Sequence, residues 1–138
     1  MTREEILAMK PGRELDALVA EKVLNLSVER WGEYAVVLNS AFGGTPIVVA
    51  DDEKSVLYRF PHKSDWVKKY STDISAAWEV VKKMEDCLHL KEHGERGNWE
   101  AFFCGASYIK GELMKVNADT APEAICKAAL LACLEVSA

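Results

Sequence analysis

YSTDISAAWEVVKKM, residues 70–84, carries the clearest secondary-structure pattern in this chain. The stretch opens with three residues, 71–73, whose side chains can accept a hydrogen bond from the amides of a first helical turn. Apolar residues then recur at helical spacing on one face. They are Ile74, Ala77, Trp78, Val81 and Met84. We therefore predict an amphipathic helix that packs Trp78 into the core.

The segments on either side predict further helices and strands. TREE (2–5) and TAPE (120–123) have the spacing of a capping box and should each begin a helix. A second helix is predicted from the apolar stripe formed by Leu15, Leu18, Val19 and Val23. Short, β-branched runs bounded by turn residues predict strands at 34–38, 46–50, 55–60, 87–93, 98–104 and 112–116. The predicted order is ααβββαβββα. Several strands are apolar at consecutive positions, which is typical of a sheet covered on both faces by helices.

Length and charge limit the class of protein. A chain of 138 residues fits one domain, 1–138, with a core of its own. A net charge of −5 argues against a protein that coats long nucleic acid, because phosphate binding needs a basic face. We expect no membrane span and no signal peptide, since no apolar run is long enough. The four cysteines are accordingly expected as reduced thiols in a cytoplasm.

One strand carries residues that could be imagined as a zinc site. Cys87, His89 and His93 alternate and would share one face, with Cys104 on a neighbouring strand. Their spacing matches no established ligand motif, and Lys91 would lie on the same face. We therefore predict no metal ion and no cofactor here, and interpret the strand as having a mixed polar face.

No catalytic arrangement has a recognisable spacing. Gly43, Gly44 and Thr45 lack the strand, lysine and helix that surround a phosphate-binding loop. Cys104 could pair with His62 or His89 as a thiol and imidazole, but a buried strand cysteine explains it equally simply. We predict that the protein is not an enzyme.

The segment that leads into the central helix interleaves aromatic and cationic side chains. Aromatic faces can stack on a base, and cations can hold phosphates. The alternative is that the aromatic residues cover the start of the helix and the lysines are solvated. The candidate ligand-binding residues are Tyr58, Arg59, His62, Trp66, Lys68 and Lys69.

Three stretches together resemble a known family. They are TREEILAMKPGRELDALVAEKV (2–23), the central stretch 70–84, and NADTAPEAICKAALLACL (117–134). These stretches are similar to the phage α-β-α sandwich domain, found in small proteins of bacteriophages and prophages. The resemblance implies an α+β fold, a three-layer α/β/α sandwich with a mainly antiparallel sheet. It also implies a phage accessory protein that works in the host bacterial cytoplasm. It implies no catalytic residues, and residues 25–69 match nothing in it.

Three functions stay open at this point. The first is a non-enzymatic anti-defence protein, a homo-oligomer that sequesters a nucleotide-derived immune signal of the host. The second is an inhibitor or structural accessory that binds a host protein. The third is a small nucleotide hydrolase that uses His62 or Cys104. A pocket lined by aromatic and basic side chains would favour the first, and a flat apolar patch would favour the second.

Overall fold

The fold was analysed in a computed structural model. It describes residues 2–26, 28–31, 34–38, 47–48, 56–57, 64–94, 97–105 and 114–134. The elements, in chain order, are α1 (Arg3–Ala8), α2 (Arg13–Lys22), β1 (Val28–Trp31), β2 (Tyr34–Leu38), β3 (Ile47–Val48), β4 (Val56–Leu57), β5 (Ser64–Trp66), α3 (Ile74–Met84), β6 (Leu88–Glu92), β7 (Trp99–Phe103), β8 (Val116–Ala118) and α5 (Ala121–Cys133). In the described part of the chain, no helix is long and apolar enough to cross a membrane.

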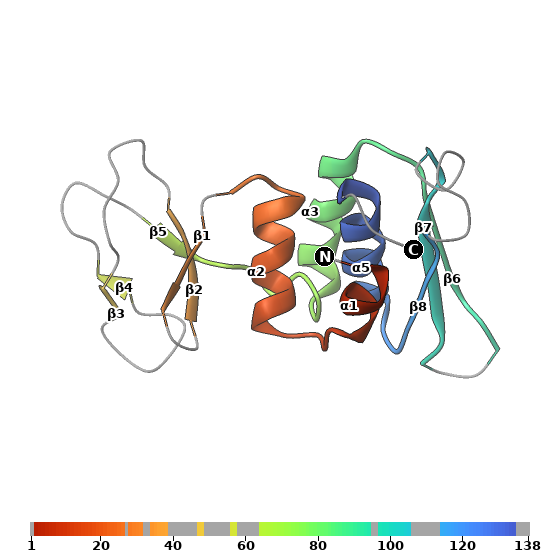
Figure 1. The fold of residues 1–138 in the computed structure, drawn as a ribbon, viewed down its shortest axis with the longest axis horizontal. Coiled ribbons are helices and arrows are strands. Elements are labelled where there is room, and N and C mark those ends of the chain that lie inside the picture. Colours follow the sequence, from red (N-terminus) through yellow and green to blue (C-terminus); the bar gives the residue numbers. More distant parts are fainter. Residues whose placement is uncertain are drawn as a thin grey trace.

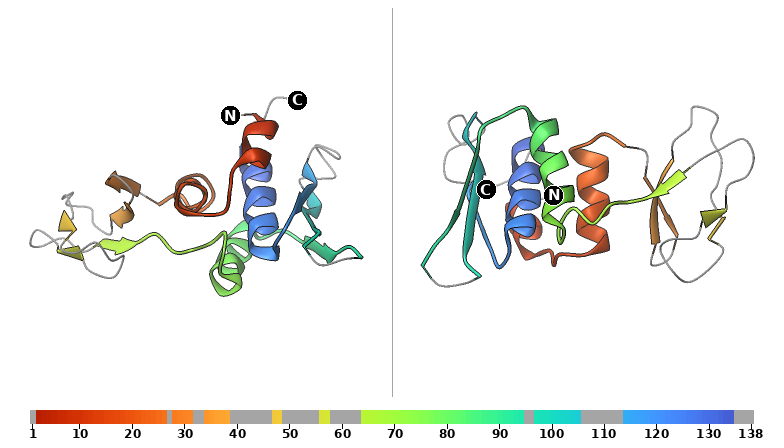
Figure 2. Two further views of the ribbon diagram at one scale, coloured as in Figure 1. Left: turned by 90° about the horizontal axis from the view of Figure 1, so that it is seen from below. Right: turned by 180° about the vertical axis from the view of Figure 1, so that it is seen from behind.

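The α+β class and the antiparallel strands are confirmed. All the described strand pairs are antiparallel. They form the sheets β1-β2-β5, β3-β4 and β6-β7-β8. Figure 1 shows the helices grouped in the middle of the molecule, with β1–β5 at one end and β6–β8 at the other. The expectation of a sheet covered by helices on both faces is therefore wrong for β6-β7-β8, which packs on α5 with one face and carries charged side chains on the other. The views in Figure 2 show the same layers from two further sides.

The predicted element order needs one correction. The described residues between α2 and α3 form five strands rather than three. The two that the sequence missed are β1 and β5, whose sequences VERW and SDW are short and polar. They extend because they pair with opposite edges of β2. Strand propensity depends strongly on such pairing, so it was a weak guide here.

Helix α5 forms the centre of the fold. Its residues 122–131 are all buried, and it packs against α1, α2, α3, β7 and β8. Its sequence, APEAICKAALLAC, is apolar nearly all round, as a helix surrounded by other elements must be. Thr120 begins it, because its side chain accepts a hydrogen bond from the Glu123 amide at 3.4 Å. The Glu123 carboxylate does not complete the predicted capping box but binds Lys127 at 2.6 Å.

The first helix begins as the sequence predicts. The Thr2 hydroxyl accepts from the Glu5 amide at 3.2 Å, and the Thr2 amide donates to the Glu5 carboxylate at 3.0 Å. Both halves of this capping box are present, so local sequence alone sets the start of α1.

The prediction that Trp78 packs into the core is wrong. Trp78 is 45% exposed and Ile74 is 41% exposed. Helix α3 instead buries Ala76, Ala77 and Val80. These smaller side chains let α3 lie close to α5. The buried side of the helix is therefore rotated away from the side that carries Ile74 and Trp78. Periodicity identified the helix correctly but did not identify which of two overlapping arcs faces inward.

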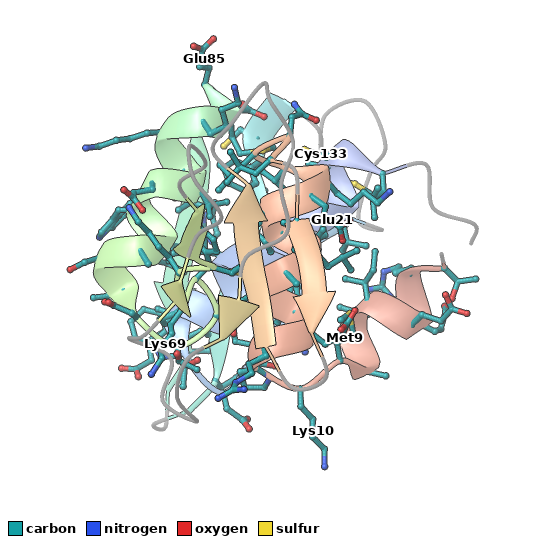
Figure 3. All side chains as sticks on the ribbon, turned by 90° about the vertical axis from the view of Figure 1, so that its left-hand side faces the viewer. Met9, Lys10, Glu21, Lys69, Glu85 and Cys133 are labelled. Atoms are coloured by element: carbon teal, nitrogen blue, oxygen red, sulfur yellow. The ribbon has the colours of Figure 1, made fainter. Side chains whose placement is uncertain are left out.

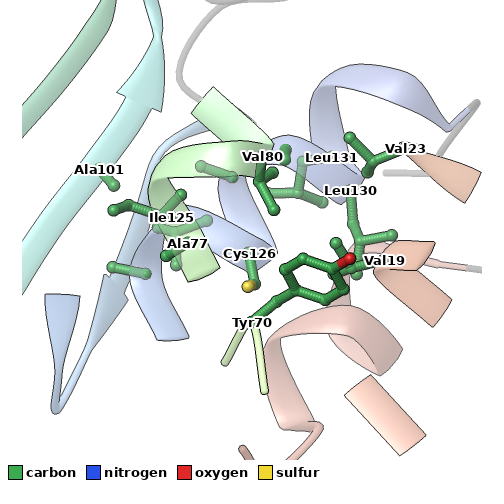
Figure 4. Close-up of a cluster of buried hydrophobic side chains, with 14 of the residues drawn as sticks. Val19, Val23, Tyr70, Ala77, Val80, Ala101, Ile125, Cys126, Leu130 and Leu131 are labelled. Carbon is green, nitrogen blue, oxygen red and sulfur yellow. The ribbon is translucent and has the colours of Figure 1, made fainter. Parts of the chain in front are cut away.

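Tyr70 takes the core position beside this helix. Its side chain is 4% exposed and belongs to the apolar cluster of α2, α3 and α5 shown in Figure 4. Burial raises the pKa of Tyr70 to about 12, and the negative charges of Glu79 and Asp16 contribute further. The alternative interpretation of the sequence, in which Tyr70 covers the start of the helix, is therefore right for this residue.

A buried polar contact joins α2 to the start of α3. The Ser71 amide and hydroxyl both donate to Asp16 Oδ1, at 2.8 Å and 2.6 Å. The Gly12 amide donates to the Ser71 hydroxyl at 2.9 Å. Asp73, rather than Ser71, caps α3, since its carboxylate accepts from the Ser75 amide at 2.9 Å. Ser71 thus fixes where the chain enters α3, and Asp73 fixes where the helix begins.

We predict that Ser71→Ala lowers the free energy of unfolding by about 1.5–3 kcal/mol, because it removes a donor to a buried carboxylate. Urea denaturation measures the change. The neighbouring exposed Thr72→Ala is the matched control and should cost less than about 0.5 kcal/mol. Equal effects of the two substitutions would contradict the role given to the Asp16 contact.

Candidate functional site

A shallow hollow lies at the N-terminal end of α3. Its volume is about 330 Å³, and it is lined by Lys68, Lys69, Asp73, Ser75, Ala76 and Glu79. Lys68 and Lys69 precede the helix, and the other residues belong to its cap and first turns. Figure 3 shows Lys69 and Glu85 at opposite ends of α3, so the hollow lies far from the helix C-terminus. Two of the six candidate ligand-binding residues therefore meet at one site.

The charges in the hollow are balanced. Lys68 Nζ lies 2.7 Å and 2.9 Å from the two carboxylate oxygens of Glu79. These side chains are 59% and 46% exposed, so their ion pair contributes little to stability. Asp73 adds a second carboxylate beside the positive end of the α3 dipole. An anion that enters the hollow must therefore displace Glu79 from Lys68.

The remaining candidate residues are not tested by the structure. Tyr58, Arg59 and His62 lie outside the described residues. Trp66 ends β5, where its backbone is opposite Val36 of β2, but its side chain also lies outside the description. Their part in a binding site stays a prediction.

Helix α3 also presents an apolar ridge to solvent. We use "α3 ridge" for Ile74 and Trp78, which are four residues apart and so lie on the same helix face. Their exposed fractions are the two largest among the big apolar side chains that the structure describes. The ridge is exposed, whereas Ala76, Ala77 and Val80 of the same helix are buried. The sequence pattern located these residues but placed them inside.

The outer face of the β6-β7-β8 sheet carries a charged cluster that sequence reasoning missed. Glu100 lies at its centre and is 9% exposed. Its Oε2 lies 2.9 Å from His89 Nε2 and 3.3 Å from His93 Nε2, and its Oε1 lies 2.9 Å from Lys115 Nζ. His93 Nε2 makes no hydrogen bond within the described structure, so its contact is an ion pair only when His93 is charged. The His89 ring stacks on Phe102, with centroids 4.5 Å apart.

Strand register explains this cluster. Lys91 is opposite Glu100 and His89 is opposite Phe102, so alternate residues of both strands share the outer face. The expectation that His89 and His93 share a face agrees with this register. Their common neighbour is a carboxylate from β7, which only the pairing of the strands could identify.

These contacts also bear on metal binding and catalysis. In the described ranges, no group of three His, Cys, Asp or Glu side chains has the geometry to hold a metal ion. His89 is hydrogen-bonded to Glu100, and Cys104 interacts with Cys87. His62 lies outside the description. The thiol–imidazole pair considered from the sequence is therefore not among the contacts that the structure gives.

The electrostatics of the cluster favour ionised Glu100. The hydrogen bond from Lys115 is the largest cause, and it lowers the pKa of Glu100 from 4.5 to about 2. Partial burial acts in the opposite direction, and the two imidazoles lower the pKa further. A carboxylate stabilised in this way holds β8 and β6 to β7 across the outer face.

The low pKa predicts how stability depends on pH. Because the pKa of Glu100 is lowered on folding, its contribution is fully present above pH 4.5 and is lost as pH falls towards 2. The difference in unfolding free energy between wild type and Glu100→Gln should therefore shrink over this interval. Urea midpoints at several pH values measure it. Lys115→Met should move the loss to higher pH. A difference that stays constant from pH 5 to 2 would contradict this assignment.

Comparisons with known proteins place the chain in a family. The model of the phage ABA sandwich domain matches residues 17–130. A solved phage protein from Bacillus cereus ATCC 14579 is 24% identical, covers 92% of this chain and 94% of its own, and superposes with a TM-score of 0.59. At that identity the likeness shows a shared fold. No curated protein matches. The match over most of the chain shows that this protein belongs to the phage ABA sandwich domain family.

Proposed function

We propose that this protein is a non-enzymatic binding protein of a phage, which captures a small, anionic, nucleotide-type ligand at the hollow before α3. One observation carries the proposal. Lys68 and Lys69, which the sequence pattern selected as phosphate-binding residues, both line the same hollow at a helix N-terminus.

The volume and the two lysines of the hollow support a small-ligand site. Its volume of about 330 Å³ lies at the lower end of the range for small-molecule pockets. Lysine ammonium groups hold phosphate as point charges. Trp66 lies two residues before Lys68, and we assign it the stacking contact with the base. Tyr58, Arg59 and His62 stay candidates for the same site from the sequence pattern alone, because they lie outside the described residues.

Glu79 sets the selectivity of this site. In the structure its carboxylate forms an ion pair with Lys68, and this pairing helps to keep the hollow electrically neutral. A weak anion gains little by replacing a carboxylate that is already in place. A ligand with two or more phosphate charges can engage Lys68 and Lys69 together, and so compensates for the loss of the ion pair.

The biological role that we propose is anti-defence. Capture of a nucleotide-derived immune signal in the host bacterial cytoplasm would silence the defence that depends on it. A protein that only binds returns the signal intact, which agrees with the absence of a recognisable catalytic spacing in the sequence. The family assignment supports the phage origin that this role requires.

Calorimetry with cyclic and ADP-ribose-type nucleotides tests the proposal. Glu79→Gln should tighten binding by about two- to tenfold because it frees Lys68, and Lys68→Gln should weaken it by a similar factor. Lys82→Gln changes the charge of an exposed α3 lysine outside the hollow and serves as the matched control. Ligand recovered unchanged after heating the complex supports sequestration.

Other outcomes would overturn parts of the proposal. A new product in the recovered material would make the protein an enzyme. Binding that is unaffected by both Glu79→Gln and Lys68→Gln would place the site elsewhere. Absence of binding across the panel would reject a nucleotide ligand.

A second function is favoured by the α3 ridge. Large apolar side chains, tryptophan above all, are enriched where proteins bind one another. The occupant that we assign to the ridge is a second copy of this chain, because the sheets β1-β2-β5 and β6-β7-β8 also leave edge strands available for association. A homo-oligomer would cover Ile74 and Trp78 together.

Light scattering tests this assignment. Wild type should show a mass above the 15.4 kDa of one chain, and Trp78→Gln should shift it towards that value. Because Trp78 is 45% exposed, its replacement should cost less than the roughly 3–5 kcal/mol expected for a fully buried aromatic side chain, so the chain should stay folded. A wild-type protein that stays at 15.4 kDa at high concentration would reject the assignment.

A further inference from the structure

Cys87 and Cys104 face each other across the ends of β6 and β7. The last paired residues of the two strands are Leu88 and Phe103. Just beyond this pair, the Cys104 amide donates to the Cys87 carbonyl at 2.7 Å. Because this hydrogen bond joins the two backbones directly, standard backbone dimensions keep their Cα atoms within about 6.5 Å of each other. That separation falls within the range of about 4.4–6.8 Å that a disulfide spans.

Asp86 fixes the two cysteines relative to one another. Its Oδ1 accepts from the Cys87 amide at 2.7 Å and from the Gly105 amide at 3.1 Å. A Cβ atom on Gly105 would lie 3.0 Å from the Asp86 carboxylate, so the glycine permits this close approach. One carboxylate thus ties the residue before the first cysteine to the residue after the second, and the thiol pair sits in a backbone frame held by hydrogen bonds.

The two thiols already interact. The neighbouring Cys87 thiol, together with partial burial, raises the pKa of Cys104 above its usual value. Cys87 is exposed and therefore accessible to reagents in solution, whereas Cys104 is half-buried. All four cysteines are free in this structure.

The other two cysteines, Cys126 and Cys133, have different surroundings. Cys126 is fully buried in α5, and burial raises the pKa of its thiol. Cys133 is exposed, but its sulfur contacts the Met84 thioether at 3.5 Å rather than a thiol. Cys133 is therefore the exposed cysteine with which the reactivity of Cys87 is compared.

We propose that Cys87 and Cys104 are a site of reversible covalent modification, at which a small disulfide of the glutathione class is reduced and a cross-strand disulfide forms. The Cys87 thiolate attacks one sulfur of the small disulfide, forms a mixed disulfide, and expels one thiol. The Cys104 thiol then loses its proton to solvent and attacks the Cys87 sulfur. The second small thiol leaves, so two protein thiols are oxidised and one disulfide is reduced to two thiols.

The bond has a structural consequence. It would link the point where the chain leaves α3 for β6 to the point where it leaves β7. This end of the hairpin is held in the reduced protein by the Asp86 contacts and by the ladder. Oxidation would add a covalent bond where the reduced protein has only hydrogen bonds, and this bond should raise the melting temperature.

Oxidised glutathione and mass spectrometry test the proposal. After treatment and alkylation, wild type should yield a Cys87–Cys104 linked peptide, while Cys133 should end as a mixed disulfide with glutathione. Cys104→Ser should stop at the mixed disulfide on Cys87, and Cys133→Ser should behave as wild type at the pair. A stable mixed disulfide on Cys87 in wild type, with no linked peptide, would overturn the proposal.

A probe that needs no oxidation gives an independent measurement. A phenylarsine oxide reagent binds tightly where two thiols can reach one arsenic atom, so it should protect Cys87 and Cys104 together from alkylation. It should not protect Cys133. Equal alkylation of Cys87 with and without the arsenical would show that the thiols do not act as a pair. Circular dichroism of each variant confirms that it is folded.

Discussion

Burial of α5 is the constraint on which the rest of the structure depends. A helix that is apolar nearly all round cannot meet water on any side, so other elements must cover it. Its small residues let α3 and the strands β7 and β8 approach closely, and α1 and α2 complete the cover. Each of those elements then has one face committed to α5. Among these elements, the faces turned away from α5 are the ones left for binding.

Two polar contacts determine how the surrounding elements are attached. Lys127 is 3% exposed, yet it projects from α5 to the Leu7 carbonyl at 2.9 Å and to Glu123 at 2.6 Å. It thereby satisfies the end of α1 as well as its own charge. Ser71 and Asp16 make the equivalent link between α2 and α3. A buried charge is tolerated only when it is paired and hydrogen-bonded, so these contacts specify position more than they add stability.

The faces left over carry different chemistry. The outer side of α3 has a lysine-lined hollow beside an apolar ridge. The outer face of the β6-β7-β8 sheet has the Glu100 cluster at its centre and the Cys87–Cys104 pair at one end. The solved phage relative extends the fold to a second protein but carries no residue-level assignment to this one. Within the part of the chain that the structure describes, the hollow is the surface where an independent sequence pattern and the geometry coincide.

Local sequence by itself determined the start of α1 at Thr2, the start of α5 at Thr120, and the existence of α3, because caps and periodicity act over one or two helical turns. It also determined the apolar character of α5 and the resemblance to the phage family. Only the tertiary structure decided that Trp78 faces outward, because the choice of buried arc depends on how closely α3 approaches α5. Strand register, which joins residues distant in the chain, placed Glu100 beside His89 and Cys87 opposite Cys104. Such contacts between distant residues leave no local pattern, because the sequence of one strand does not specify which strand pairs with it.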